Sequence, residues 1–257
     1  EELGKMDFIF ITLKAYSITG MAKEIAKLFD ENTSVITAYN GIPWWYFFNT
    51  GGQFNNYRIK CIDPNNTQWN LITPERIIGC VVYPATEIIR PGVIKHMEGN
   101  RFSLGEPSGV QSERISRISK ALISAGLKAP IRNNIRQEIW TKLIGNLAFN
   151  PLSVITGETL DVLLSKKENK DIAYAAMKEA SLIMDKLQIP LNISIDQRIE
   201  GAAKVGAHKT SMLQDLEMGR RLEIDSVMGA VLEIGAKLDI PMPYTNAIYS
   251  CLKLLTK

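Results

Sequence analysis

The chain has 257 residues, of which 46% are hydrophobic and 22% charged, and its net charge is +3 at pH 7. This composition is typical of a globular protein with one large domain or two ordinary ones. The lysines and arginines are scattered and form no basic run interleaved with aromatic residues, so we expect no nucleic-acid partner. No apolar run approaches the roughly 20 residues that span a bilayer, so we expect no membrane segment.

The three cysteines, Cys61, Cys80 and Cys251, are far apart and odd in number. They predict neither a zinc cluster nor a disulfide framework, so we expect no metal site and a reducing, cytoplasmic location. The chain does not begin with methionine, and its first residues do not resemble a signal peptide. We therefore expect that some sequence is missing in front of it.

The first 40 residues predict part of a doubly wound α/β sheet. Buried strands are expected at 7–13 and 34–39, with a helix at about 18–29 between them. Lys14 follows the first strand and Asn40 the second. Ligands of such sheets lie outside the carboxyl ends of the strands, which makes both residues candidates. A plain turn at Asn40-Gly41 is the alternative interpretation of the second position.

The next segment predicts fewer regular elements. Residues 50–75 are rich in Gly, Asn, Thr and Pro and indicate a loop with one short strand. A further buried strand is expected at 76–83, and shorter strands at 93–97 and 101–104. An amphipathic helix is then expected over 112–125. Its predicted inward residues are Ile115, Ile118, Leu122 and Ile123.

After Pro130 nearly every segment has helical periodicity, and Asn134, three residues before Gln137, is typical of a helix N-cap. Helix breaks are expected at Pro151, Pro190, Gly201, Gly219 and Pro241-Met-Pro243. We therefore predict an α/β plus all-α protein, in which a partial Rossmann-type doubly wound parallel sheet (1–132) precedes a C-terminal helical domain (133–257).

Lys142, Asn146 and Asn150 recur every four residues in the sequence W-T-K-L-I-G-N-L-A-F-N-P. On a helix they fall within roughly an 80° arc, which also holds Ile135 and Ile139 and should be buried. The predicted solvent face is Gln137, Glu138, Thr141, Gly145 and Ala148. A buried ammonium is costly unless it has partners or lines a wet cavity. The pattern indicates either a functional site or a buried structural network.

A second dense polar stretch occupies 210–225, and a helix is predicted from about Arg220 to Leu238. Glu223 would lie in the first turn of that helix, where the helix dipole favours a carboxylate. Such a residue is structural more often than functional. Ser211 alone is most simply a helix cap. A G-x-G-x-x-G loop is absent, so we expect the chain to begin inside the nucleotide-binding domain.

Five motifs in order resemble the ketopantoate reductase (2-dehydropantoate 2-reductase) family along essentially the whole chain. They are L-K-A-Y at 13–16, N-G-I-P-W-W at 40–45, G-C-V-V-Y-P-A at 79–85, W-T-K-L-I-G-N-L-A-F-N-P-L at 140–152, and S-M-L-Q-D with R-R-L-E-I-D within 211–225. The resemblance implies a Rossmann domain, a helical domain and a site in the cleft between them. It also implies hydride transfer from NADPH to the C2 carbonyl of ketopantoate in pantothenate biosynthesis.

The resemblance implies roles for eight residues. Lys142 matches the catalytic lysine that protonates the carbonyl oxygen, and its apolar neighbours should lower its pKa. Asn146 and Asn150 match substrate-holding asparagines, and Ser211 the serine at the substrate carboxylate. The other matches are Glu223, a catalytic acid near substrate and nicotinamide ribose, Ala85 beside the cofactor, and Lys14 and Asn40 beside the cofactor and near the substrate.

Some features depart from the family pattern. Leu160 stands where some members have a further asparagine, which favours a related branched 2-keto acid, and 50–75 is a longer insertion than compact members have. We expect the region that selects NADPH over NADH to lie outside this sequence. A non-catalytic pseudo-reductase or fragment and a related hydroxy-acid dehydrogenase remain alternatives. The expected partners are a small 2-keto acid and, for assembly, a homodimer.

Overall fold

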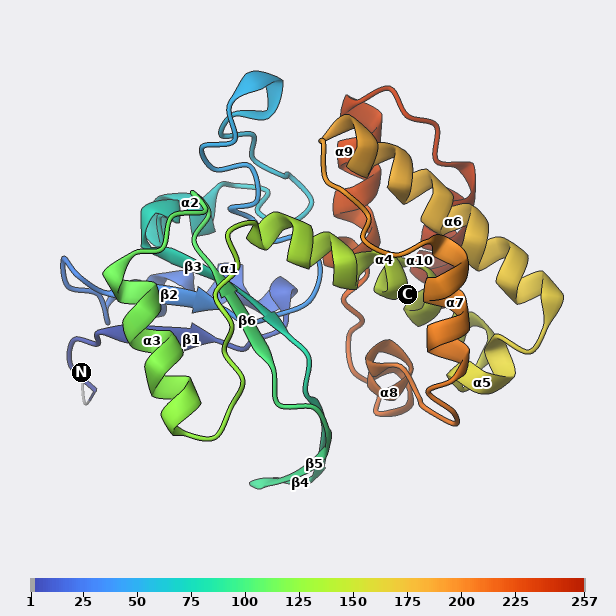
Figure 1. The fold of residues 1–257 in the computed structure, drawn as a ribbon, viewed down its shortest axis with the longest axis horizontal. Coiled ribbons are helices and arrows are strands. Elements are labelled where there is room, and N and C mark those ends of the chain that lie inside the picture. Colours follow the sequence, from blue (N-terminus) through green and yellow to red (C-terminus); the bar gives the residue numbers. More distant parts are fainter. Residues whose placement is uncertain (1–2, 257) are drawn as a thin grey trace. The chain divides into compact units, whose positions relative to one another are not determined.

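The computed structural model describes residues 3–256, and Figure 1 shows the elements in chain order. Two compact units are distinguished by their internal contacts. The first consists of Glu1–Arg58 and Asn65–Glu138, and the second of Ile59–Pro64 and Ile139–Lys257. A six-residue segment from the first half of the chain therefore belongs to the second, helical unit.

The first unit contains a four-stranded sheet in the order β1-β2-β3-β6. Its strands are β1 (Phe8–Ile11), β2 (Ser34–Thr37), β3 (Ile77–Val82) and β6 (Phe102–Gly105). Strands β1, β2 and β3 are mutually parallel, with Ile11 opposite Thr37 and Thr37 opposite Gly79, whereas β6 is antiparallel to β3. The predicted strands at 7–13, 34–39, 76–83 and 101–104 are thereby confirmed in a mixed sheet.

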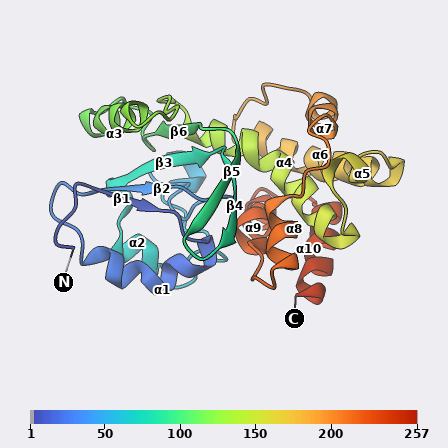
Figure 2. The same cartoon turned by 90° about the horizontal axis from the view of Figure 1, so that it is seen from below.

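Helices cover both faces of this sheet, as in a doubly wound fold (Figure 2). Helices α1 (Ala15–Ala26) and α2 (Thr67–Leu71) lie on one face, and α3 (Glu113–Ser124) lies on the other. All four residues of β2 are buried, because a central strand that is covered on both faces exposes neither set of side chains. The core under α3 is formed by Ile36, Ala38, Ile78, Cys80, Leu104, Ile115, Ile118 and Ala129.

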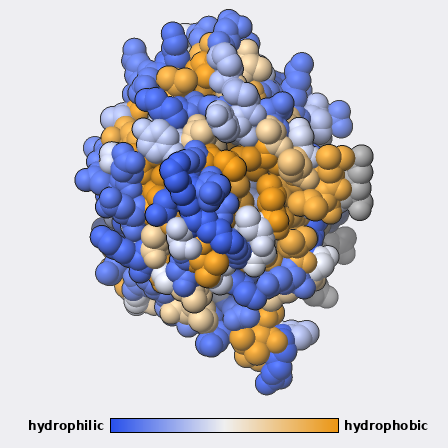
Figure 3. Space-filling view, turned by 90° about the vertical axis from the view of Figure 1, so that its right-hand side faces the viewer, coloured by the Kyte–Doolittle hydropathy of each residue, from blue (hydrophilic) through white to orange (hydrophobic). Residues whose placement is uncertain are grey.

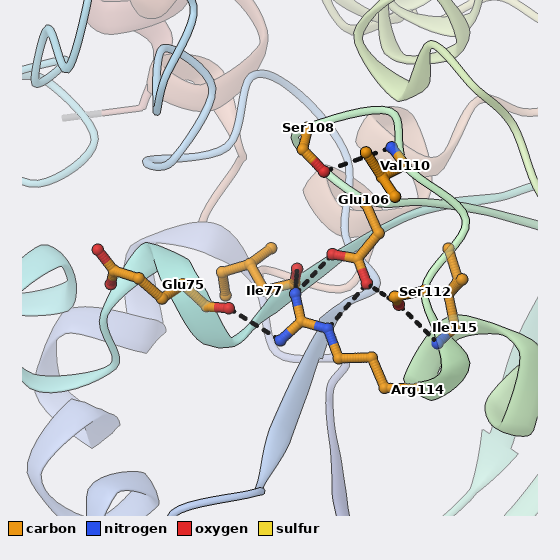
Figure 4. A network of polar contacts seen from close by, with 8 residues as sticks. All are labelled: Glu75, Ile77, Glu106, Ser108, Val110, Ser112, Arg114 and Ile115. Carbon is orange, nitrogen blue, oxygen red and sulfur yellow. Dashed lines mark hydrogen bonds and ion pairs between the residues drawn. The ribbon is translucent and has the colours of Figure 1, made fainter.

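A network of polar contacts fixes the start of α3 against the sheet (Figure 4). Ser112 caps the helix by accepting a hydrogen bond from the Ile115 amide, and it donates to Glu106 at 2.5 Å. Arg114 makes two contacts with the same buried Glu106 carboxylate, at 2.5 and 2.8 Å. The predicted helix is confirmed, but Ile123 is 56% exposed and does not point inward as predicted.

Residues 50–105 differ most from the prediction. The segment 50–75 forms no strand and instead contains α2 and the short 3-10 helices η1 (Gly52–Phe54) and η2 (Pro74–Arg76). A separate antiparallel hairpin follows, made of β4 (Ala85–Arg90) and β5 (Val93–Glu98). The sequence predicted β5 but not β4. Pro91 and Gly92, with φ +78° at Gly92, form the turn between them.

The second unit is helical. Its helices are α4 (Ile135–Thr156, of which the first four residues belong to the first unit), α5 (Leu160–Leu163), α6 (Lys167–Lys186), α7 (Ile195–Ala203), α8 (Ser211–Glu217), the π-helical turn η3 (Asp225–Gly229), α9 (Ala230–Lys237) and α10 (Pro243–Leu255). Two predicted breaks are wrong: Pro151 lies inside α4 and Gly201 inside α7. Gly219, with φ +64°, follows the end of α8 as predicted.

Among residues 3–256, no helix is long and apolar enough to cross a membrane. The face drawn in Figure 3 carries hydrophilic residues beside apolar ones.

Candidate active site

Three candidate residues of the first unit lie at one edge of its sheet. Lys14 is the N-cap residue of α1 and follows β1, Asn40 follows β2, and Ala85 follows β3. These three strands are parallel neighbours, so their carboxyl ends meet at the same edge. All three residues are half-buried. Gly41, with φ +89°, turns the chain directly after Asn40.

The first turn of helix α4 belongs to the first unit and packs against its sheet, whereas the polar stripe of Lys142, Asn146 and Asn150 lies farther along the helix, in the second unit. The Asn134 side chain accepts a hydrogen bond from the Gln137 amide at 3.0 Å, which confirms the predicted cap. Ile135 lies over two paired glycines, because a Cβ at Gly79 or Gly105 would come within 2.8 or 2.5 Å of it. The start of α4 is therefore determined by close packing against the sheet.

Two charged side chains add polar contacts to this anchor. The Arg136 guanidinium donates to the backbone oxygens of Tyr46, Phe48 and Pro107 at 2.5–2.7 Å. Burial lowers the pKa of Arg136. The Glu138 carboxylate accepts hydrogen bonds from the Tyr83 hydroxyl at 2.9 Å and from Ser103 at 2.7 Å. Glu138 was predicted to face solvent, but these contacts with the sheet half-bury it.

The three residues of the stripe lie on one continuous helix, as predicted. Lys142 and Asn146 are half-buried and Asn150 is 8% exposed. The predicted solvent face is wrong, because Gly145 and Ala148 are buried and no residue between 135 and 154 is exposed. A helix that is buried all round has no separate solvent face, so sequence periodicity could not orient it.

Arg198 on α7 packs against α4 beside the stripe, and the sequence analysis did not identify it. A Cβ at Gly145 would come within 2.9 Å of two guanidinium nitrogens of Arg198. Gly145 therefore permits the guanidinium to lie against the α4 backbone, one residue before Asn146 and three after Lys142. The only sequence signal was a glycine in a helix interior, which weakens a helix unless packing requires it.

Two buried hydroxyl groups join the end of the stripe to the start of α8. The Ser153 hydroxyl donates to the Asn150 backbone oxygen at 2.8 Å and lies 2.5 Å from the Thr210 hydroxyl. Thr210, and not Ser211, is the N-cap of α8, because its hydroxyl accepts from the Leu213 amide. The predicted cap role of Ser211 is wrong. Ser211 is the first helical residue, and its side chain is exposed.

Glu223 is 7% exposed and lies at the end of a segment without helix or strand, residues 220–223. The predicted helix from Arg220 is wrong at its start, since helical structure begins only at Ile224 and continues as the π-helical turn η3. The Glu223 backbone oxygen accepts hydrogen bonds from the Val227 amide and the Ser226 hydroxyl, both at 3.3 Å. Glu223 is thus placed by the turn that follows it.

The candidate residues of the helical unit supply an ammonium, two amides, a hydroxyl and a carboxylate. Within residues 3–256 no group of three or more His, Cys, Asp or Glu side chains could hold a metal ion. A set of donors with one cation suits a small anionic ligand with polar substituents. The first unit supplies the carboxyl edge of a parallel sheet, which is the usual ligand edge of doubly wound folds.

The sequence is similar to one protein family along both halves of the chain. The description "Ketopantoate reductase PanE/ApbA" matches residues 1–45, and "Ketopantoate reductase PanE/ApbA C terminal" matches residues 134–256. A protein from Mesorhizobium japonicum named 2-dehydropantoate 2-reductase is 48% identical over 255 residues. That alignment covers 99% of this chain and 78% of the relative.

Solved structures have a similar fold. A candidate ketopantoate reductase from Ralstonia solanacearum MolK2 is 35% identical with a TM-score of 0.94, over 98% of this chain and 77% of that one. A D-mandelate dehydrogenase in ternary complex with NADH and anilino(oxo)acetate is 20% identical, with a TM-score of 0.80 over 96% and 75% of the chains. This second likeness shows a shared fold.

Proposed function

Because this chain belongs to the ketopantoate reductase family, we propose that it reduces 2-dehydropantoate, or a similar branched 2-keto acid, to the 2-hydroxy acid with NADPH. The observation that carries the proposal is the 48% identity, over 99% of the chain, to a protein named 2-dehydropantoate 2-reductase. The stripe of Lys142, Asn146 and Asn150 on a helix that is buried all round supports it independently.

The reaction places negative charge on a carbonyl oxygen, and the proposed role of Lys142 follows from that charge. The nicotinamide cofactor, when bound, supplies the hydride that reaches the carbonyl carbon. The Lys142 Nζ donates a hydrogen bond to the carbonyl oxygen and transfers a proton to it as the charge develops. A half-buried ammonium is well suited to this task, because its charge is less screened there than in water.

The remaining residues would bind and orient the substrate. Asn146 and Asn150 are on the same face of α4 as Lys142, so their amides can hold hydroxyl or carbonyl groups of the substrate next to the acid. Ser211, at the first position of α8, would donate to the substrate carboxylate. The hydroxyl pair of Ser153 and Thr210 supports this arrangement by fixing the start of α8 against the end of the stripe.

Both the first unit and the family membership support a nicotinamide dinucleotide as the cofactor. Lys14, Asn40 and Ala85 follow the ends of the parallel strands β1, β2 and β3, and they offer a cation, an amide and a small side chain at the ligand edge of the sheet. We assign these residues, with Glu223, to the neighbourhood of the cofactor. Dependence on a nicotinamide dinucleotide is a property of the family, and the choice of NADPH over NADH is our proposal.

The test is a spectrophotometric assay of NADPH and NADH oxidation by the full-length protein with a panel of 2-keto acids. We expect the highest kcat/KM with ketopantoate and NADPH. A higher kcat/KM for another branched keto acid would revise the substrate, and Leu160 is the residue that favours that outcome. Absence of oxidation with every keto acid and both cofactors would overturn the proposal.

The biological setting follows from the same proposal. It places the activity in the cytoplasm as a step of pantothenate biosynthesis, carried out by a homodimer. Light scattering of the full-length protein at several concentrations tests the assembly, and a mass of one chain at every concentration would contradict it.

A further inference from the structure

We propose that Asp225 is a positioning residue, which sets the orientation of the Glu223 carboxylate by fixing the π-helical turn η3. This inference rests on the proposed function, since the role of Glu223 does. All the residues involved belong to the helical unit. Asp225 would touch neither substrate nor cofactor and would act through the backbone that joins it to Glu223.

The Asp225 carboxylate is held by two donors from α10. The Tyr249 hydroxyl donates to Oδ1 at 2.8 Å, and the Lys253 ammonium lies 2.9 Å from Oδ1 and 3.1 Å from Oδ2. Burial and the Asp225 hydrogen bond raise the pKa of Tyr249. Burial alone would lower the pKa of Lys253, but the hydrogen bond and charge of Asp225 outweigh it and raise that pKa. Both donors therefore stay protonated in the folded protein at neutral pH.

The same turn is shaped to receive this side chain. A Cβ at Gly229 would lie 3.3 Å from Asp225 Oδ1 and 3.5 Å from Asp225 Cβ, so the carboxylate lies along the turn over a glycine. The Cys61 thiol would be 3.6 Å from that Cβ, and it lies 4.0 Å from the Asp225 backbone oxygen. Residues 225–229 are thus enclosed by α10 on one side and by the segment 59–64 on the other.

The segment 59–64 is itself fixed to the helix that continues from the turn. The amides of Lys60 and Cys61 donate to the two carboxylate oxygens of Glu233, at 2.8 and 3.0 Å. Glu233 lies on α9, directly after η3. A bidentate contact between a carboxylate and two amides holds both partners in one orientation. Residues 59–64 of the insertion at 50–75 therefore contact both η3 and the helix that continues from it.

The orientation of Glu223 depends on η3 because the two are joined by only one residue, Ile224. The Glu223 backbone oxygen is bonded by Val227 and Ser226, which are both residues of the turn. A π-helical turn accommodates one more residue than an α-helical turn, and such turns are frequent at functional sites. A shift from π- to α-helical geometry would rotate the residues before the turn and re-aim the Glu223 side chain.

A double-mutant cycle in the full-length enzyme tests the inference. We compare kcat of Asp225→Asn in the native background with kcat of the same substitution in an Glu223→Gln background. If Asp225 acts through Glu223, the substitution lowers kcat about tenfold in the native background and less than about twofold with Glu223→Gln, because interacting residues are not additive. Equal fold-losses in both backgrounds, or no loss in the native one, overturn the proposal.

Two further variants keep the outcome interpretable. Tyr249→Phe removes one hydrogen bond and retains the ring, so it replaces Asp225→Asn in the cycle if that variant does not fold. Asp171→Asn is the matched control, because Asp171 forms an exposed ion pair with Lys167 on α6, and its kcat should equal that of the native enzyme. Thermal unfolding separates general destabilisation from the kinetic coupling. An inactive native enzyme would count against the proposed function and not against the role of Asp225.

Discussion

Helix α4 and the segment 210–229 both carry candidate site residues of the helical unit, but they hold them in different ways. In α4 the backbone does the positioning: Lys142, Asn146 and Asn150 share a face because they are four residues apart on one continuous helix. In the second segment a short helix, an irregular stretch and a π-helical turn follow one another. There Ser211 follows Thr210, whose hydroxyl contacts Ser153 of α4, and the Glu223 backbone oxygen is bonded by residues of the turn η3.

The difference teaches where substitutions should act. A change in α4 alters the chemical groups of the site directly or disturbs packing on every side of the helix. A change in the residues that hold the segment 210–229, such as Thr210, Asp225 or Ser153 at the end of α4, should act indirectly on the site and have smaller effects. Four predictions test this contrast.

The largest effect is expected for Lys142→Ala in the full-length protein. Loss of a general acid typically lowers turnover by about 10²–10⁴-fold, and cofactor affinity should stay nearly unchanged. Steady-state kinetics and calorimetric titration with NADPH measure the two quantities. Lys167→Ala, at an exposed lysine of α6, is the control and should be unaffected. Ordinary turnover in Lys142→Ala would remove the proposed acid from the mechanism.

The second-largest effect is expected on the free energy of unfolding, and it tests whether α4 has no solvent-exposed face. Ala148→Leu inserts a larger side chain at a residue with 0% exposure and should lower the free energy of unfolding by about 1–3 kcal/mol. Ala236→Leu, at an exposed position of α9, should change it by less than about 0.5 kcal/mol. Chemical denaturation measures both. Equal free energies of unfolding for the two variants would mean that Ala148 faces solvent, as the helical periodicity of the sequence predicted.

Ser153→Ala should have a smaller and mainly indirect effect. It removes the contact with Thr210 and leaves that buried hydroxyl with one partner fewer, at a cost of about 1 kcal/mol. Because α8 would be less well fixed, KM for the keto acid should rise severalfold with little change in kcat. Ser181→Ala is the matched control, since Ser181 bonds only within its own helix, to the Lys178 backbone oxygen. A pure loss of kcat would contradict the link to Ser211.

The smallest effect concerns alkaline pH. The pKa values of Tyr249 and Lys253 are raised from 10.0 and 10.5 in the folded protein, so their contribution to stability is complete below those values. It is lost as the pH rises through the raised values. Urea unfolding at about pH 8 and pH 11 should therefore show the stability gap between native protein and Asp225→Asn narrowing, by less than about 1 kcal/mol. A stability difference between the two proteins that grows with pH would contradict this prediction.

Local patterns predicted those features that depend on neighbours along the chain. The apolar runs of β1, β2 and β3, the cap at Asn134 and the polar stripe of α4 each depend on a few adjacent residues. The predicted break at Pro151 was wrong because residues 147–154 of α4 are all buried, and the missing proline N–H removes only one hydrogen bond from a helix held by that burial.

Features that depend on distant partners were missed. Strand β4 is an exception, because it was missed although its partner β5 is its sequence neighbour across the Pro91-Gly92 turn; two register shifts interrupt this pairing, so a simple alternation of apolar residues does not mark the strand. The π-helical turn η3 involves Asp225, α10 and the segment 59–64, and its contact between Cys61 and Asp225 joins residues 164 positions apart in the chain. No local period encodes such a turn.

By itself the sequence determined the parallel strands, the helical second half and the spacing that puts Lys142, Asn146 and Asn150 on one face of a helix, because these follow from backbone periodicity. Only the tertiary structure decided which side of α4 is covered, which residue caps α8 and where the helix after Glu223 begins. Those outcomes depend on Arg198, Ser153 and Tyr249, whose contacts arise from packing between elements far apart in the chain.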